Sequence, residues 1–216
     1  MKTKRFFFTL ITVFCTVFIA FSQQDKKAKD LLDKSLAVFS NAGGIKASFA
    51  FTAKQPNEKS SESFNGTIYM KENKFRLETP EFQAWFNGVN QWTYLKDNNE
   101  VNLTKPDADE VQQMNPSAVL SIYKKGFNCK YAGEKTVNGK KIDEIVLTPQ
   151  KKNDWKKVVV QLDKTTTLPV RIQLQYANGM LNDIVISAYQ MKQSFSDSLF
   201  SFDSQKYPGV EVIDLQ

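Results

Sequence analysis

The stretch Ile45-Lys46-Ala47-Ser48-Phe49-Ala50-Phe51-Thr52-Ala53-Lys54 decides the fold of this chain. Apolar residues at its odd-numbered positions alternate with residues that are mostly polar. Only a strand gives a period of two, because its successive side chains point to opposite faces of a sheet. We therefore expect a strand here with one apolar face.

The residues just before this strand follow a different period. Over residues 25–41 the apolar positions recur every three or four residues, and Gly43-Gly44 come next: Ala28, Leu31, Leu32, Leu36, Val38 and Phe39. This spacing predicts an amphipathic helix that ends at the glycines.

The chain after residue 54 continues mainly as strands. Alternating runs separated by short polar connectors predict antiparallel strands at residues 63–71, 74–79, 82–87, 91–96, 100–104, 128–137, 140–148, 155–163, 168–176 and 180–192. Asn138-Gly139 and Asn178-Gly179 are strong hairpin signals. Pro208-Gly209 before Val210, Val212 and Leu215 predicts a last edge strand.

Residues 105–126 interrupt the strands with a helical pattern. We expect one short helix here, and a second that begins at Pro116 and ends at Gly126. About 11 antiparallel strands are too many to stay flat without curling. The predicted fold is therefore mainly β with helices (α+β): a strongly curved sheet forming an incomplete barrel, covered by the N-terminal helix and this helical insert.

The first 22 residues have the features of a secretion signal. Lys2, Lys4 and Arg5 precede an apolar run at residues 6–21, and Ala20 and Ser22 fit a cleavage site. The alternative is a retained membrane anchor, because the run is nearly long enough to span a bilayer. We expect cleavage after Ser22, a single domain over residues 23–216, and a soluble periplasmic product whose net charge falls from +6 to +3.

Composition excludes several classes of function. The chain has no histidine, so triads built on histidine cannot form. It has no clustered basic stripe for a nucleic acid. Asp107, Asp109 and Glu110 stand where a helix begins, which favours helix capping over a catalytic or calcium role, and Asp143-Glu144 form no convincing pair. We expect no enzyme activity, cofactor or metal.

The aromatic residues point to a binding site. Strand alternation directs a set of apolar side chains to one face of the sheet, which a lone helix would cover incompletely. This face is either plain core or the wall of an apolar cavity. The cavity residues that we predict are Phe64, Ile68, Met70, Phe75, Leu77, Phe82, Phe86, Met114 and Leu120, and the lid residues are Leu32, Leu36, Phe39, Glu72 and Lys74.

Several segments, taken in order, resemble one known family. They are Ile45-Lys46-Ala47-Ser48-Phe49, residues 64–71 (FNGTIYMK), residues 74–78 (KFRLE), Asn87-Gly88 before Gln91-Trp92-Thr93-Tyr94, residues 145–149 (IVLTP), residues 168–172 (LPVRI), and Phe200-Ser201-Phe202 with Pro208-Gly209-Val210. Behind a signal peptide, this order is similar to that of the outer-membrane lipoprotein carrier protein family (LolA).

The resemblance implies a function. Members take a lipoprotein from an inner-membrane transporter, hold its acyl chains in the cavity, and pass it to an outer-membrane receptor. On this basis we expect a monomeric periplasmic chaperone for lipoproteins that contributes to outer membrane biogenesis. The alternatives are a periplasmic lipid- or lipoprotein-sensing regulatory protein of the same fold and a carboxylate-dependent hydrolase.

One position departs from the family pattern. After the strand that ends at Lys71, family members carry a basic residue that holds the lid closed, whereas this chain has Glu72. Either Lys74 takes over this role by a two-residue shift, or the cavity opens more readily here.

Overall fold

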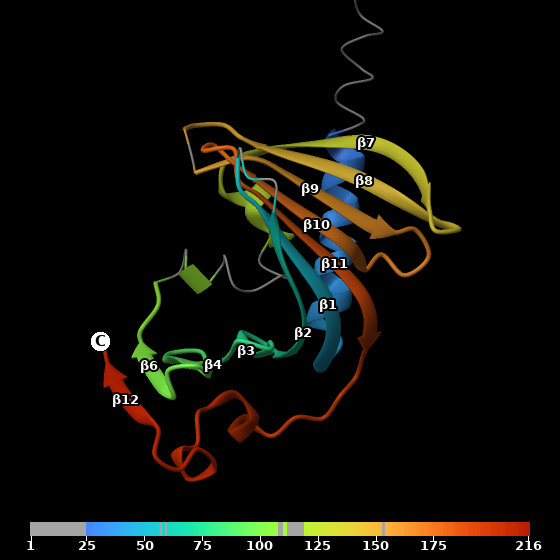
Figure 1. The fold of residues 1–216 in the computed structure, drawn as a ribbon. Coiled ribbons are helices and arrows are strands. Elements are labelled where there is room, and N and C mark those ends of the chain that lie inside the picture. The colour runs from blue at the N-terminus through green and yellow to red at the C-terminus, as the bar shows by residue number, and fades with distance from the viewer. Residues whose placement is uncertain (1–24, 57, 59, 108–109, 112–118, 153) are drawn as a thin grey trace, which may run out of the picture.

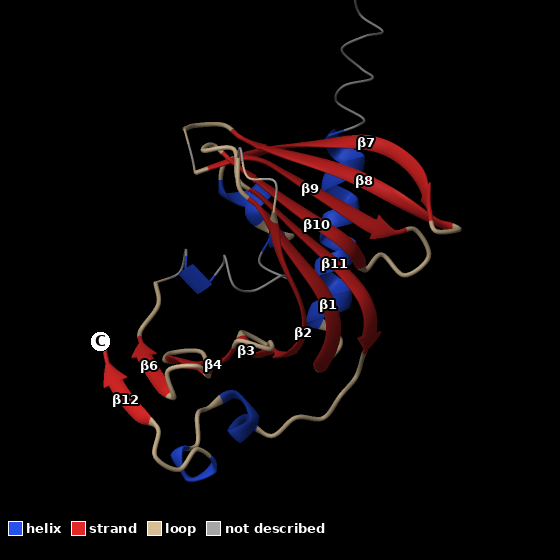
Figure 2. Ribbon diagram, viewed as in Figure 1, coloured by secondary structure: helices blue, strands red, loops and turns tan. Residues whose placement is uncertain are grey.

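The computed structural model describes residues 25–216 except residues 57, 59, 108–109, 112–118 and 153, so the predicted signal peptide lies outside the described residues. The described chain starts with a helix (residues 25–40) and continues into one twelve-stranded sheet (Figure 1). The strands are β1 (Gly44–Lys54), β2 (Ser61–Lys71), β3 (Lys74–Glu78), β4 (Phe82–Phe86), β5 (Gln91–Leu95), β6 (Glu100–Thr104), β7 (Phe127–Val137), β8 (Lys140–Pro149), β9 (Trp155–Asp163), β10 (Pro169–Tyr176), β11 (Leu181–Gln190) and β12 (Glu211–Asp214). Three 3-10 helices accompany them: η1 (Ile122–Lys125), η2 (Asp197–Phe200) and η3 (Ser204–Lys206). The fold is mainly β with helices, as predicted (Figure 2).

The sheet has the strand order β12-β6-β5-β4-β3-β2-β1-β11-β10-β9-β8-β7. Neighbouring strands are antiparallel except at one edge. Both predicted Asn-Gly hairpins form. Asn138 and Gly139 have φ values of 50° and 77°, which suits a two-residue turn with two left-handed positions. In the Asn178-Gly179 turn only Gly179 has a left-handed backbone conformation, with a φ of 93°.

The predicted last edge strand is present, but β12 pairs with β6 in parallel. Antiparallel hairpins need only a tight turn, whereas a parallel pair needs a long connection. Residues 191–210 provide this connection and run below β3–β6 in the view of Figure 1. We call them the C-terminal segment.

The expectation of a strongly curved incomplete barrel is wrong in this respect: the sheet is neither closed nor strongly curled. Strands β12 and β7 form its two edges and each pairs with one neighbour. Open sheets of this size do occur in proteins. Here the helix packs on one face, and the C-terminal segment packs on the other face of β2–β5.

Two clusters of buried apolar residues lie on one face of the sheet. The first covers β7–β10 and includes the helix and the end of the insert: Ala28, Leu32, Val119, Leu120, Ile122, Phe127, Cys129, Ile145, Leu147, Trp155, Val158, Val160, Leu162, Ile172 and Leu174. The second covers β1–β4: Ala42, Ile45, Ala47, Ile68, Met70, Phe75, Ala84 and Phe86. Phe39 packs against both clusters, so the end of the helix bridges them.

The opposite face of β2–β5 carries a second set of aromatic residues. The ring of Trp85 lies 5.5 Å from Phe202 and 5.8 Å from Tyr207, centroid to centroid. Tyr207 also lies 4.9 Å from Tyr94, and its hydroxyl donates to Gln83 at 2.8 Å. The C-terminal segment therefore shields these aromatic residues from water.

The predicted helical insert lies partly outside the described residues, and so does Pro116. Its second half ends in η1, and Gly126 stops η1 with a φ of 89°, as predicted. Val119, Leu120 and Ile122 pack into the first core cluster beside Leu32. The described end of the insert is thus part of the core over β7–β10.

Candidate functional site

The second core cluster surrounds an apolar cavity of about 550 Å³. Alternate residues of β1–β5 and β11 point to the same face and form its wall, as the register pairs Ala47 with Ile68 and Ile68 with Leu77 indicate. The lining residues are Phe39, Ala47, Phe49, Phe51, Phe64, Ile68, Met70, Phe75, Leu77, Phe82, Ala84, Gln91, Thr93, Leu95, Ile184, Ile186 and Tyr189.

Phe64 is the centre of an aromatic cluster on this wall. Its ring stacks on Phe51 at 4.9 Å and meets Phe49 and Phe82 edge-on, both at 6.4 Å. These rings are only partly buried, although they are large and apolar. A partly exposed aromatic wall inside a hollow is typical of a site that receives an apolar ligand.

The cavity contains few polar groups and, among the described residues that line it, no charged one. The Gln91 Nε2 donates to Thr93 Oγ1 at 3.4 Å, and the Gln91 Oε1 is buried without a partner among the described atoms. Tyr189 turns its hydroxyl away, to the carbonyl of Pro169 at 2.8 Å, and burial raises the pKa of Tyr189. Burying an unpaired charge here would cost far more than burying a hydrocarbon.

Six of the nine predicted cavity residues line this cavity: Phe64, Ile68, Met70, Phe75, Leu77 and Phe82. Phe86 lies behind the wall, with its ring 5.5 Å from Phe75. Leu120 lies in the other core cluster, fully buried, and so is not a wall residue. Met114 lies outside the described residues.

The lining residues that the sequence reasoning missed come from β1, β4, β5 and β11: Ala47, Phe49, Phe51, Ala84, Gln91, Thr93, Leu95, Ile184, Ile186 and Tyr189. Ile184, Ile186 and Tyr189 reach the cavity because β11 pairs with β1, although about 135 residues separate paired positions such as Phe49 and Ile186. The alternation of β11 was visible in the sequence, but its neighbour was not.

The three predicted lid residues of the helix lie in different surroundings. Leu32 is fully buried in the first core cluster, and Leu36 packs against that cluster. Phe39 lines the apolar cavity and meets the Tyr189 ring edge-on at 6.1 Å. Only the last turn of the helix therefore covers the cavity.

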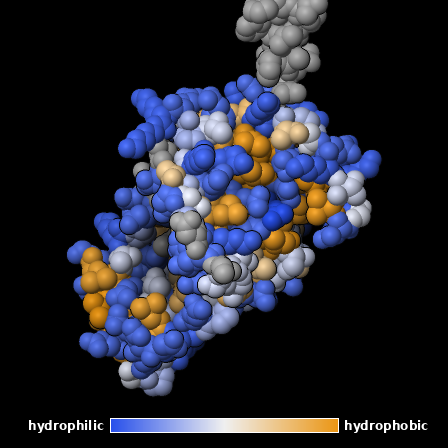
Figure 3. Space-filling model, turned by 45° about the horizontal axis from the view of Figure 1, so that its top comes forward, coloured by the Kyte–Doolittle hydropathy of each residue, from blue (hydrophilic) through white to orange (hydrophobic). Residues whose placement is uncertain are grey.

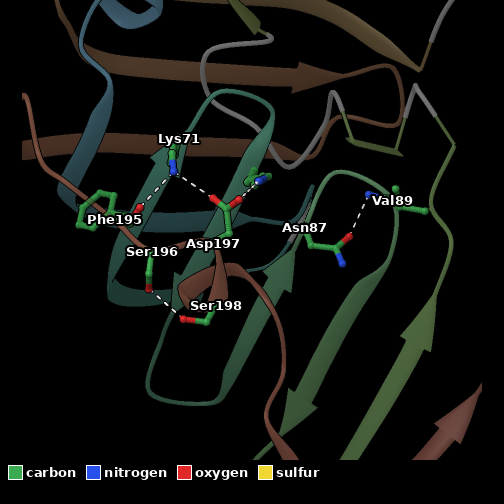
Figure 4. A network of polar contacts seen from close by, with 8 residues as sticks. Lys71, Asn87, Val89, Phe195, Ser196, Asp197 and Ser198 are labelled. Carbon is green, nitrogen blue, oxygen red and sulfur yellow. Dashed lines mark hydrogen bonds and ion pairs between the residues drawn. The ribbon is translucent and has the colours of Figure 1, made fainter.

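Lys74 contacts the C-terminal segment rather than the helix. The Nζ atoms of Lys71 and Lys74 each lie 2.9 Å from a different oxygen of Asp197. Lys71 also donates to the Phe195 carbonyl at 3.1 Å, so its ammonium lies between Phe195 and Asp197 (Figure 4). These hydrogen bonds, from Lys71 and then Lys74, hold the pKa of Asp197 below its usual value. Glu72 is exposed in the β2–β3 turn, where its φ is 55°.

The remaining acidic candidates have structural partners. Asp107 and Glu110 form a reciprocal capping pair, in which each side chain accepts from the other residue's backbone N–H at 2.9 Å; Asp109 lies outside the described residues. Asp143 accepts from the Tyr131 hydroxyl at 2.7 Å. Burial alone would raise the pKa of Glu144, but hydrogen bonds from Lys135 and Gln161 hold it below its usual value.

Neither a metal cluster nor a membrane-spanning helix is found in the described part of the chain. Its His, Cys, Asp and Glu side chains form no group of three or more that could hold a metal ion. None of its helices has the length and apolar character needed to cross a bilayer. In the space-filling view hydrophilic residues cover most of one face, and apolar residues appear between them as separate patches (Figure 3).

The fold and the cavity define a class of mainly β proteins that keep an apolar site beside a single N-terminal helix. The model of the family "outer membrane lipoprotein carrier protein LolA" matches residues 18–178. The chain belongs to this family, as its sequence motifs predicted.

Solved structures are similar to this chain at low sequence identity. An uncharacterized conserved protein from Thermus thermophilus has a TM-score of 0.59 at 11% identity, with 87% of this chain and 99% of that chain covered. A LolA superfamily protein from Nitrosomonas europaea has a TM-score of 0.46 at 11% identity, with 81% and 97% covered. No curated protein matches the chain.

Proposed function

We propose that this protein is a periplasmic carrier that binds acyl chains of lipoproteins in the apolar cavity and moves them from the inner to the outer membrane. The observation that carries this proposal is an aromatic-walled cavity, without a charged lining residue among those described, in a member of the LolA family. Binding, rather than chemical turnover, is the role that this site supports.

The size of the cavity suits an apolar ligand. Its volume of about 550 Å³ lies within the range of roughly 300–1,000 Å³ that is usual for ligand pockets. Each methylene removed from water contributes about 0.8 kcal/mol. Burial of an acyl chain would therefore supply a favourable driving force for binding.

The proposal also covers the route of the cargo. The predicted signal at residues 1–22 would send the chain to the periplasm with cleavage after Ser22. No phosphate-binding glycine-rich loop is present in the sequence, so transfer would run downhill from an inner-membrane transporter to a receptor of higher affinity.

The test is a transfer experiment with one lipoprotein in two forms, acylated and with its lipidated cysteine replaced by serine. The protein should remove only the acylated form from inner-membrane vesicles, and should then release it to outer-membrane vesicles. Equal capture of both forms would contradict acyl-chain binding. Capture without release would instead support the sensing role. N-terminal mass spectrometry of the periplasmic fraction tests the cleavage at Ser22.

A further inference from the structure

A second cavity of about 580 Å³ lies at the end of the N-terminal helix. It is formed where the helix ends, where β1 begins, where β2 ends, and where the C-terminal segment leaves the sheet. Its lining residues are Leu36, Phe39, Ser40, Gly43, Ile45, Met70, Lys71, Glu72, Gln193, Ser194 and Phe195.

The two cavities adjoin each other. Phe39 and Met70 line both of them, so these two side chains form the wall between the cavities. Both side chains can change conformation, because methionine is flexible and Phe39 is only partly buried. A ligand that fills the apolar cavity could therefore extend past them into the second cavity.

The second cavity differs from the first in chemistry. Leu36, Ile45 and Met70 give it an apolar floor, while hydroxyl, amide and charged groups line the rest: Ser40, Lys71, Glu72, Gln193 and Ser194. The amide group of Gln193 is held in place, because its Nε2 donates to the Met191 carbonyl at 3.1 Å. The two cavities together form an amphipathic site, with one apolar and one mixed compartment.

The charges around the second cavity give an anion no net attraction. Lys71 is the lining cation, and it shares the carboxylate of Asp197 with Lys74, which leaves one positive charge over. Glu72 is the lining anion, in no ion pair among the described residues, and its charge cancels this remaining one. An anionic group that entered the cavity would therefore lose its hydration without a net attraction to offset the loss.

We infer that the second cavity is a binding site for the uncharged, hydrogen-bonding head of an acylated ligand, such as ester or amide groups, while the acyl chain lies in the apolar cavity. This inference rests on the proposed function and adds a preference for the head of the ligand. Carbonyl oxygens of the head would accept hydrogen bonds from the Ser40 and Ser194 hydroxyls and from the Lys71 ammonium.

The test compares two ligands with the same chain and different heads, monopalmitoylglycerol and palmitate, by calorimetry at pH 8 and low salt. We expect monopalmitoylglycerol to bind about fivefold to tenfold more tightly, because the charged head of palmitate would lose hydration in a lining that offers it no net attraction. Equal affinities at low salt would overturn the inference.

The decisive variant is Glu72→Gln, which removes the charge and keeps the size. It should bring the ratio of the two Kd values close to one. Glu62→Gln is the matched control: Glu62 is an exposed acidic residue of β2 that lines neither cavity, and its loss should leave the ratio as in the wild type. An unchanged ratio in Glu72→Gln would also overturn the inference.

The two proposals fail in different ways. If neither palmitoyl ligand binds, acyl-chain binding itself is wrong. If both bind with equal affinity and Phe64→Glu weakens both, the apolar cavity holds the chain but the second cavity does not select the head.

Discussion

The hydroxyl of Tyr123 donates a hydrogen bond of 2.7 Å to the Asp33 carboxylate, which joins the end of the helical insert to the N-terminal helix. The Lys124 Nζ lies 2.9 Å from the same carboxylate oxygen. The Tyr123 hydrogen bond, and then the one from Lys124, lower the pKa of Asp33. This contact lies over the first core cluster, away from the position after β2 where the family pattern placed a latch.

The Asp33 contact should stabilise the fold at neutral pH. The pKa of Asp33 is lower in the folded state than its ordinary value of 3.8. The contribution of the Asp33 contact to the free energy of unfolding is therefore fully present above pH 3.8, and it is lost as the pH falls through the pKa of the folded state. Asp33→Asn should lower the free energy of unfolding by about 1 kcal/mol at pH 7, and by less at pH 3. Urea denaturation at both pH values measures this.

Asp30→Asn is the control for this experiment, since Asp30 is an exposed acidic residue of the same helix. A loss of stability in Asp33→Asn that is equal at both pH values, or that Asp30→Asn reproduces, would contradict a specific role for the Tyr123–Asp33 contact.

Phe64→Glu should abolish binding of a fluorescent fatty acid. The new carboxylate would lie among the rings of Phe49, Phe51 and Phe82, where none of the described lining residues carries a positive charge. Asn65→Glu places the same charge one residue along β2, on the opposite face, and should bind as the wild type does. Circular dichroism checks that both variants fold. Normal binding by folded Phe64→Glu would place the acyl chain elsewhere.

Asp197→Asn should loosen the C-terminal segment while β12 and the aromatic contacts remain. The substitution removes the carboxylate that Lys71 and Lys74 share. Amide hydrogen exchange should become faster around residues 195–200 and stay unchanged in β8–β10, where the core is buried. Asp214→Asn serves as the control at the exposed end of the chain. Equal exchange in wild type and Asp197→Asn would mean that the aromatic contacts alone hold the segment.

The thiol of Cys129 should be unreactive in the folded protein. Burial raises the pKa of Cys129 to about 12, so very little thiolate forms at pH 8. A thiol reagent at pH 8 should label Cys129 only after unfolding in urea, and its labelling rate in water should follow the rate of global or local opening. Fast stoichiometric labelling of the native protein would show that the first core cluster opens readily.

Local patterns in the sequence determined the strands and their faces. The period of two around Ile45 and Phe49 placed their side chains on one face of β1, and six of the predicted residues line the cavity as a result. Asn138-Gly139 predicted its hairpin because left-handed backbone positions favour these residues. The family motifs are also local segments, and the match of the family model over residues 18–178 confirmed the family that they predicted.

Only the tertiary structure decided which distant strands are neighbours. The pairing of β1 with β11 brings Ile186 and Tyr189 to the cavity, and the parallel pairing of β12 with β6 draws Asp197 across to Lys71 and Lys74. A strand pattern specifies which face is apolar but not which strand lies beside it, because backbone hydrogen bonds are the same for every partner. The choice depends on how the whole chain buries its apolar faces at once. For the same reason Leu120, apolar and helical by pattern, joined the core over β7–β10 instead of the cavity.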